Sequence, residues 1–226
     1  MKINGDLTKP VLLDAGSIEW VPSPAAGVDR RMLYREGTEV ARATSIVRYA
    51  VGSAFPPHVH SGGEEIMVLS GTFQDEYGDY PAGSYFRNPP GTSHSPAAAE
   101  GCEIFVRLWQ FRQGDTAHII RRPGEGEPLP PRDGLDLARL LFDDQSERVV
   151  IETWTANATV TVTNNRGLEF LILSGSMSVD SQPLTVQGWG RLPAGQDFTA
   201  TAGAEGVKVW IKDGPLQHPD VLTMPV

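Results

Sequence analysis

The chain has 226 residues, which is enough for one large domain or two compact ones with a sizeable core. Its 19 Lys and Arg residues stand against 28 Asp and Glu residues, and the formal net charge of -9 disfavours binding to a nucleic-acid backbone. No apolar run approaches the ~18 residues that span a bilayer, and the first residues lack the apolar core of a signal peptide. We therefore expect a cytoplasmic protein with no membrane contact.

The residue types predict an all-β fold. The chain contains 24 Gly and 18 Pro, and its Thr, Val and Ile residues fall in short runs, a pattern typical of many short strands joined by tight turns. The segment 135–142 is the best candidate for a helix, but it is too short for hydrophobic periodicity to distinguish a helix from a strand. Cys102 is the only cysteine, so the chain can form no intramolecular disulfide, which fits a reducing compartment.

Two histidines and a glutamate fall close together in segment 52–71. Residues i and i+2 of a β-strand point to the same side of the sheet, so His58 and His60 converge. Glu64 keeps this parity beyond a small turn, whereas Glu65 is expected to face the opposite way. Glu64 is also favoured because it completes the pattern G-x5-H-x-H-x3-E-x6-G. We expect these three side chains to bind one metal ion.

A second motif follows in segment 83–94. It reads G-x5-P-x-G-x2-H and ends at His94, which supplies a fourth ligand. Two motifs in order, each with its glycines in register, form a far more specific signal than an isolated H-x-H pair. Together they resemble both signature motifs of the cupin superfamily, which implies a jelly-roll (double-stranded β-helix) barrel. Three imidazoles and one carboxylate accept Zn, Fe(II), Mn, Ni or Cu, so these residues leave the identity of the divalent ion open.

The sequence contains an internal repeat. An offset of 104 residues carries segment 65–71 onto 169–175, and the same offset carries Arg87 onto Arg191. Upstream, the segment that begins at Gly27 finds its counterpart at an offset of 107. An offset that persists across two motifs indicates that a whole domain has been duplicated.

The proline- and glycine-rich segment 121–134 separates the two copies, because its composition favours an extended crossing over regular structure. A closed barrel or jelly roll also manages the sheet edges that many short strands would otherwise expose. We therefore predict two tandem cupin barrels, an N-terminal one over residues 1–121 and a C-terminal one over residues 122–226, which together form a bicupin.

The C-terminal copy has lost all four metal-binding side chains. The offset maps His58, His60, Glu64 and His94 onto Val162, Asn164, Leu168 and Phe198, in that order. We expect this barrel to bind no ion there and to fill the vacated space with apolar side chains, as a close-packed interior requires. The alternative is an organic-ligand pocket built from Asn164, Glu169, Arg191, Trp154 and Trp189.

The segment from His58 to His94, HVHSGGEEIMVLSGTFQDEYGDYPAGSYFRNPPGTSH, resembles the cupin domain of ChrR-like anti-sigma factors. The resemblance is closest over residues 40–112 and implies a sensory cupin with three His and one Glu on a divalent ion, commonly zinc, with Fe, Mn or Ni as alternatives. Ala98 departs from the broader cupin pattern, in which an Asn often follows the last His by four. The separate helical domain with which these factors grip a sigma factor is not recognisable in this sequence, so sigma-factor binding is not carried over.

Two functions remain open on sequence alone. The ChrR-like resemblance favours a non-enzymatic metal-binding module, sensory or scaffold-like. Other cupins with the same ligand set are dioxygenases that act on small organic substrates, which gives the alternative. For either function we expect a small-molecule ligand, consider a homodimer as the assembly, and expect no nucleic-acid or membrane partner.

Other chemically active side chains receive supporting roles. We expect surface or supporting positions, rather than the mouth of the metal barrel, for Arg48, Tyr49, Arg87 and Arg107. Cys102 is expected to be a small buried side chain. His118 and His218 have no motif around them and are expected to be ordinary surface residues.

Overall fold

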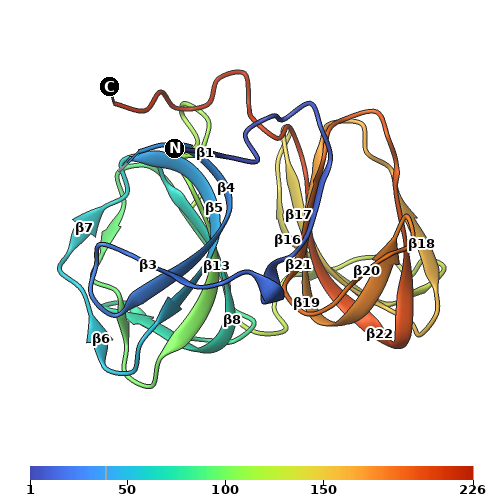
Figure 1. Ribbon diagram of the computed structural model, residues 1–226, viewed down its shortest axis with the longest axis horizontal. Coiled ribbons are helices and arrows are strands. Elements are labelled where there is room, and N and C mark those ends of the chain that lie inside the picture. Colours follow the sequence, from blue (N-terminus) through green and yellow to red (C-terminus); the bar gives the residue numbers. More distant parts are fainter. Residues whose placement is uncertain (39, 226) are drawn as a thin grey trace. The chain divides into compact units, whose positions relative to one another are not determined.

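The computed structural model describes residues 1–38 and 40–225, which form β-strands and turns (Figure 1). Apart from one short 3-10 turn, η1 (Ala15–Ser17), no helix occurs among them, and hence none that is long and apolar enough to cross a membrane. The prediction of an all-β chain is confirmed. The ambiguous segment 135–142 lies in strand β16 (Leu135–Asp143).

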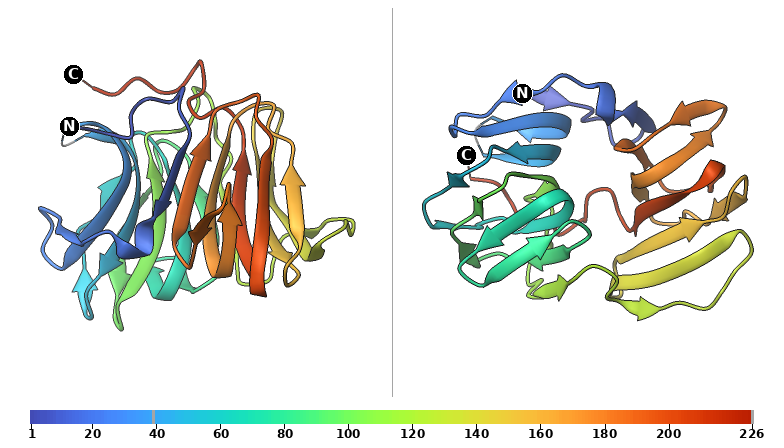
Figure 2. Two further views of the ribbon diagram at one scale, coloured as in Figure 1. Left: turned by 45° about the vertical axis from the view of Figure 1, so that its right-hand side comes forward. Right: turned by 90° about the horizontal axis from the view of Figure 1, so that it is seen from below.

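The chain folds as two compact units, which we call the first and the second barrel (Figure 2). The first barrel contains Met1–Gly5, Glu19–Gly124 and the residues from Gln217 onward. The second contains Asp6–Ile18 and Glu125–Leu216. The change of barrel at Gly124 lies close to the predicted boundary between residues 121 and 122.

The ends of the chain depart from that simple division. Strand β2 (Val11–Asp14) precedes most of the first barrel in sequence but pairs antiparallel with β21 (Gly188–Leu192), so it extends the sheet of the second barrel. It thereby supplies the hydrogen-bond partners of an otherwise open strand edge. The C-terminal segment returns to the first barrel, where the backbone NH of Leu222 donates to the carbonyl of Phe111 at 3.0 Å.

The first barrel is built around one antiparallel sheet and a separate two-stranded ladder. Along the sheet the strands follow the order β1 (Lys2–Ile3), β4 (Val28–Gly37), β5 (Ala41–Tyr49), β13 (Cys102–Leu108), β8 (Glu64–Asp75), β10 (Tyr85–Asn88) and β14 (Ile119–Arg121). The ladder joins β7 (His58–Val59) to β11 (Ser93–His94). The short strands β3 (Val21–Pro22), β6 (Ser53–Ala54), β9 (Gly78–Pro81) and β12 (Ala97–Ala98) pair alongside.

The second barrel repeats this arrangement. Its strands follow the order β15 (Glu127–Pro128), β16, β17 (Arg148–Trp154), β22 (Phe198–Asp213), β19 (Leu168–Val179), β21 and β2. Strand β18 (Thr159–Val162) pairs with β22, and β20 (Gln182–Leu184) pairs with β19. Each sheet matches the cupin-like jelly roll that the two motifs predicted.

The strands of the two barrels follow the offset of 104 residues. Strand β8 and strand β19 are both 12 residues long and begin at Glu64 and Leu168, which the offset of 104 relates. Gly71 and Gly175 occupy equivalent places with φ of 66° and 76°. A Cβ on either would approach a carbonyl oxygen, that of Gly101 or that of Gly206, to 2.2 Å, so both positions require glycine.

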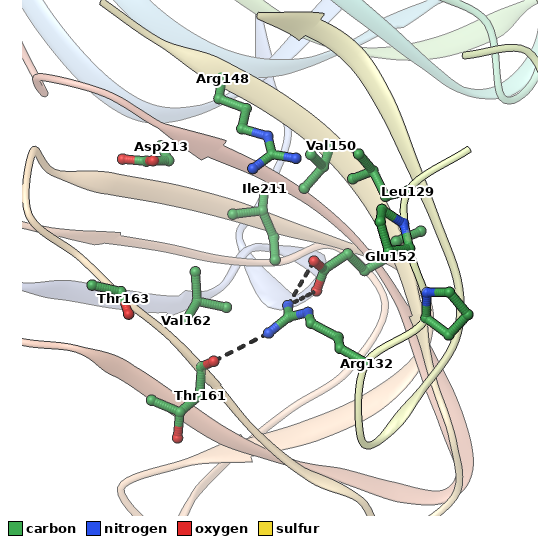
Figure 3. A pocket seen from close by; sticks show the side chains of 13 residues that line it. Leu129, Arg132, Arg148, Val150, Glu152, Thr161, Val162, Thr163, Ile211 and Asp213 are labelled. Atoms are coloured by element: carbon green, nitrogen blue, oxygen red, sulfur yellow. Dashed lines mark hydrogen bonds and ion pairs between the residues drawn. The ribbon is translucent and has the colours of Figure 1, made fainter. Parts of the chain in front are cut away.

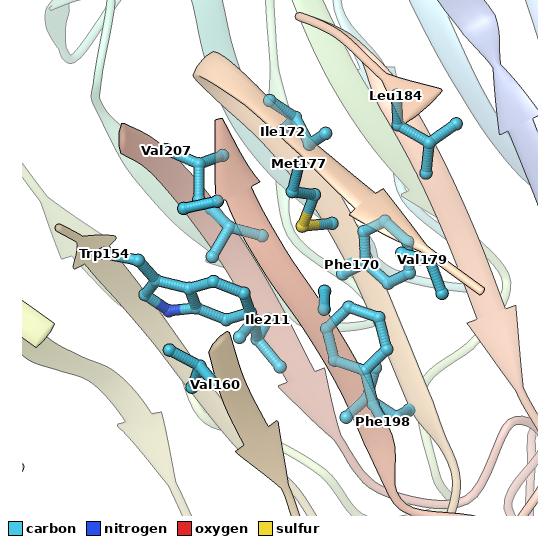
Figure 4. Close-up of a cluster of buried hydrophobic side chains, with 14 of the residues drawn as sticks. Trp154, Val160, Phe170, Ile172, Met177, Val179, Leu184, Phe198, Val207 and Ile211 are labelled. Atoms are coloured by element: carbon cyan, nitrogen blue, oxygen red, sulfur yellow. The ribbon is translucent and has the colours of Figure 1, made fainter. Parts of the chain in front are cut away.

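The interior of the second barrel is apolar. Figure 4 shows Phe170 and Phe198 side by side, and their rings stack with centroids 4.7 Å apart. Trp154 packs beside Phe198 at a centroid distance of 6.3 Å. Leu168 and Phe198 are both 0% exposed, and Val162 packs against the same cluster. The prediction that apolar side chains fill this place is confirmed.

Candidate metal centre

Three histidines meet in the first barrel. His58 and His94 lie directly opposite each other in the ladder of β7 and β11, and His60 follows β7 by one residue. The ring centroids are 5.1 Å apart for His58 and His60, 5.2 Å for His58 and His94, and 4.5 Å for His60 and His94. One nitrogen from each ring lies within 4.8 Å of the other two, so the three rings can hold one ion. His60 and His94 are buried, whereas His58 is exposed.

A hydrogen-bond chain orients the ring of His60. The Nδ1 atom lies 3.0 Å from the Oγ1 atom of Thr92, and this hydroxyl donates its own hydrogen to the carbonyl of Pro89 at 2.7 Å. The hydroxyl therefore accepts from Nδ1–H, which leaves Nε2 as the unprotonated nitrogen. Nε2 is buried and has no hydrogen-bond partner within residues 1–38 and 40–225. A buried acceptor of this kind calls for a partner, and a cation supplies one.

The other two rings are oriented in the same way. Nδ1 of His94 lies 3.3 Å from the Oδ2 atom of Asp75, and Nδ1 of His58 lies 3.4 Å from the carbonyl of Pro56. Both acceptors favour a proton on Nδ1 and leave Nε2 available as a ligand. Metal-binding histidines commonly donate their second nitrogen to a carboxylate, a carbonyl or another oxygen, which fixes the tautomer and the ring direction.

Glu64 completes the group. Its Oε1 atom lies 3.4 Å from Nε2 of His60 and 3.4 Å from Nε2 of His94, and it accepts a hydrogen bond from Nδ2 of Asn88 at 2.9 Å. Two ligand atoms that each lie about 2.1 Å from a shared ion are separated by roughly 3.0 to 3.4 Å at octahedral to tetrahedral angles. The observed spacings fit this range. The structure thus groups the three histidines that the sequence singled out and places Glu64 beside two of them, His60 and His94.

Glu65 points to the opposite face of β8, as strand parity predicts. Its carboxylate accepts hydrogen bonds from the hydroxyl of Tyr85 at 2.6 Å and from Arg107 at 2.5 Å. Arg87 is 1% exposed and donates to Asp115 at 2.7 Å. Arg87 and Arg107 therefore belong to a buried ionic network on this opposite face, in the supporting role expected for them.

Burial governs the charges of the site. It lowers the pKa of His60 to about 3, with the neighbouring rings of His94 and His58 adding to the effect. Burial also raises the pKa of Glu64. At His94 burial disfavours the charge, but the hydrogen bond that the ring donates to Asp75 and the negative charge of Glu64 outweigh it and raise the pKa. His60 is thus held neutral at ordinary pH, the form in which a ring nitrogen binds a metal.

A cavity of about 280 Å³ opens beside the site, and we call it the His94 cavity. Its polar lining includes Asn88, Thr92, His94 and His118, and its apolar lining includes Phe86 and Ile120. Tyr77 and Tyr80 also line it. Since Asn88 and Thr92 hold Glu64 and His60, a molecule in this cavity lies next to the groups that orient the candidate ligands.

Sequence reasoning missed several of these residues. Asn88 and Thr92 lie inside the second motif, each directly beside one of its fixed proline or glycine positions, so their place in the motif was an available signal. Asp75 lies far along β8 from Glu64, and no periodicity connects the two. His118 is exposed as expected, but it lines the His94 cavity. His218 was expected at the surface and is instead 5% exposed.

Cys102 is buried, as expected, and burial raises the pKa of its thiol to about 12. A thiol in this state is protonated at ordinary pH and is a poor nucleophile. Tyr49 pairs with Cys102 across β5 and β13 and shares this buried environment.

The corresponding place in the second barrel holds no ligand group. Val162 and Phe198 pair across β18 and β22 in the register that His58 and His94 have in the first barrel. The Nδ2 atom of Asn164 donates to the carbonyls of Pro193 and Gln196 at 2.8 and 3.0 Å, and its Oδ1 accepts from the backbone of Gly167. Asn164 therefore holds a turn together.

The five residues of the alternative organic-ligand pocket, Asn164, Glu169, Arg191, Trp154 and Trp189, are buried and are not among those that line the cavity of this barrel. The indole of Trp189 donates to Glu169 at 2.8 Å, and both side chains are buried. Asn164 is satisfied by the backbone. The second barrel does contain a cavity, but other residues line it.

The jelly-roll barrels and the cluster of histidines define a cupin-like protein with a candidate metal centre, and comparisons with known proteins agree. Residues 8–112 match the model of the ChrR cupin-like domain family. The sequence finds no match among curated proteins. The resemblance to the cupin superfamily and to ChrR-like cupin domains is confirmed.

Solved structures share the fold at low sequence identity. A candidate dioxygenase from Nostoc punctiforme superposes with a TM-score of 0.69 at 16% identity, over 97% of this chain and 88% of its own. The pirin YhhW of Escherichia coli, solved with nickel(II), gives 0.68 at 16% identity, over 92% and 100%. Oxalate decarboxylase of Bacillus subtilis gives 0.62 at 15% identity, over 93% and 78%. These likenesses establish the fold.

Proposed function

We propose that this protein is a bicupin that binds a single divalent metal ion in its first barrel, through His58, His60, Glu64 and His94. The observation that carries the proposal is the orientation of the three rings: each Nδ1 has an oxygen partner, and the Nε2 atom of His60 is buried without a hydrogen bond to any described residue. Zinc is the ion we favour, because imidazole and carboxylate suit it and because the ChrR-like match supports it. Iron, manganese and nickel are the alternatives.

The role we propose for this site is sensory or regulatory. The match of residues 8–112 to the ChrR cupin-like family supports it. A small molecule in the His94 cavity would contact Asn88 and Thr92, whose hydrogen bonds hold Glu64 and His60. A small molecule that shifts these two side chains would change the affinity of the site for the metal ion. The bound ion would then change the affinity for the small molecule by the same factor. We further propose that this module is cytoplasmic and that it assembles as a homodimer.

The second candidate is a metal-dependent dioxygenase acting on a small organic substrate. The His94 cavity favours it, because a substrate there lies beside a metal ligand. An ion bound at the site would supply Lewis acidity and, if it is redox-active, electron-transfer chemistry. His118 faces the cavity and can accept or return a proton at a ring nitrogen. Burial raises the pKa of Tyr80 to about 12, so its hydroxyl stays protonated and can orient a substrate oxygen.

Two measurements on one anaerobically purified sample separate these functions. Elemental analysis counts the bound ion, and an oxygen electrode follows oxygen uptake with aromatic diketones and hydroxyketones. The sensory proposal expects one ion per chain and no substrate-dependent uptake. Uptake that is lost in His118→Ala, while the ion is retained, would establish the dioxygenase instead. A protein that binds no divalent ion would overturn both.

A further inference from the structure

The second barrel contains a cavity of about 520 Å³, larger than the His94 cavity, and we call it the Arg148 cavity. Its volume lies within the range of small-molecule sites. Apolar side chains line much of it, among them Leu129, Ala138, Val150, Val162 and Ile211. Charged side chains face the same space (Figure 3): Arg132, Arg148, Glu152 and Asp213. Neither the metal centre nor the proposed function uses this cavity.

The charges are a feature of the second barrel alone. Asp213 pairs with Arg148 and with Leu168, whereas the equivalent Leu108 of the first barrel pairs with Ala43 and Glu64. In the same register Glu152 takes the place of Val47. The second barrel has therefore exchanged the metal-binding carboxylate for leucine and has gained charged groups where the first barrel has alanine, leucine and valine.

Most of these charges already have partners. Glu152 accepts two hydrogen bonds from Arg132, at 2.6 and 2.7 Å, and a third from the indole of Trp154 at 2.8 Å. Arg132 also donates to the carbonyl of Thr161 at 3.2 Å. The dashed lines in Figure 3 mark the bonds of Arg132, which fix this wall of the cavity. Asp213 accepts two hydrogen bonds from Arg166, at 3.1 and 2.7 Å.

Arg148 has a guanidinium whose hydrogen-bond donors are not all satisfied by the described residues. It forms a long ion pair, 3.8 Å from Nε to the Oδ2 atom of Asp143, and both side chains are about two-fifths exposed. Its Nε atom is buried and lacks a hydrogen-bond partner within the described part of the chain. In Figure 3 the guanidinium lies beside Val150 and Ile211, so a polar donor group borders an apolar wall. A guanidinium in this setting fits the planar, two-oxygen geometry of a carboxylate.

We infer that the second barrel binds a small organic acid, a monocarboxylate with an apolar body, independently of the metal centre. The carboxylate pairs with Arg148, and the apolar body lies against Val150, Val162 and Ile211. A single negative charge is expected because Arg132 is already neutralised by Glu152. The two barrels then differ in what they bind: the first binds a cation and the second binds an anion.

Calorimetric titration of the full chain with benzoate and hexanoate tests this, with benzamide and hexanamide as neutral counterparts of the same shape. The acids are expected to bind. The amides are expected to have an affinity lower by about tenfold or more, because they cannot form the hydrogen-bonded charge pair. Arg148→Gln should reduce the acids to the level of the amides, and Arg148→Lys should fall between. The matched control Arg122→Gln removes an exposed arginine of the first barrel and should leave the affinity unchanged.

Three results would overturn the inference. The first is that acids and amides bind equally well. The second is that folded Arg148→Gln or Arg148→Lys protein binds the acids with unchanged affinity, and the third is that millimolar acid gives no heat of binding. His60→Ala should keep the acid affinity. A loss of acid binding in that variant would place the acid at the metal centre and would also contradict the inference.

Discussion

The two barrels hold opposite contents at the same place in the same strand register. In the first, the paired residues are His58 and His94, whose rings lie 5.2 Å apart with their nitrogens directed at a common point. In the second, the paired residues are Val162 and Phe198, and the ring of Phe198 is 0% exposed. The same backbone register therefore carries a candidate metal site in one barrel and an apolar interior in the other, and the side chains make the difference.

The two barrels are therefore stabilised in different ways at this place. The first barrel leaves a buried acceptor, Nε2 of His60, unsatisfied within the described residues, so an ion that binds only the folded form would stabilise it by mass action. The second barrel is stabilised there by apolar burial around Phe198. Removing His60 should therefore affect metal binding by the first barrel only, and removing the ring of Phe198 should affect the packing of the second barrel only.

The largest expected effect is the loss of the ion from His60→Ala. The substitution removes one proposed ligand, whose Nε2 is buried without a hydrogen bond to any described residue. Elemental analysis should find metal content reduced from one ion per chain to nearly none, with a lower melting temperature. His118→Ala, an exposed histidine beside the same cavity, is the matched control and should keep its ion. Full occupancy in His60→Ala would show that the ligand set is misassigned.

The next largest effect concerns the apolar interior of the second barrel. Phe198 stacks on Phe170 and packs beside Trp154, so Phe198→Ala should cost about 3 to 5 kcal/mol of unfolding free energy. Urea denaturation measures this, and Phe198→Leu, which keeps most of the volume, should cost less. Metal content should not change in either variant. An unchanged midpoint for Phe198→Ala would argue against a packed interior at this place.

A smaller effect is expected at the residues that orient the ligands. Asn88 donates to Oε1 of Glu64 at 2.9 Å, and loss of such a group typically weakens metal affinity by about 10- to 100-fold. Competition with a chelator should reveal this weakening in Asn88→Ala. Asn4→Ala, an asparagine of the same barrel whose side chain bonds the carbonyl of Leu33, is the control and should retain wild-type affinity. Equal affinity in the two variants would leave Asn88 without the role assigned to it.

The sequence predicted the candidate ligands better than it predicted the residues that orient them by hydrogen bonds. Spacing in the two motifs predicted His58, His60, Glu64 and His94, because strand parity links neighbours in sequence to one face of a sheet. The offset of 104 residues predicted the register in which Val162 faces Phe198. Asp75 could not be predicted, since its contact with His94 depends on how the long strand β8 curves across the barrel.

The remaining misses share a physical cause. Strand β2 joins the second barrel through a backbone ladder, and backbone hydrogen bonds leave little trace in side-chain patterns. Arg132 comes from the segment between the copies, which sequence composition marks only as an extended crossing. The cavity that it lines with Arg148 forms when that segment lies against β17 and β22, a contact between distant parts of the sequence.

The smallest expected effect is that of Cys102→Ser. The thiol is buried and lies outside the motifs, and burial raises its pKa to about 12, so it is not the thiolate that binds metals. Elemental analysis of Cys102→Ser should find the same metal content as the wild type. A folded Cys102→Ser protein without its ion would place sulfur among the ligands.

The metal stoichiometry of the wild-type chain tests the difference between the barrels most directly. The protein is stripped with a chelator, reloaded with excess zinc, desalted and measured by elemental analysis against protein concentration. The account predicts one ion per chain, bound by the first barrel. Two ions per chain would show that the second barrel also binds metal, and none would show that the four converging side chains of the first barrel do not form a metal centre.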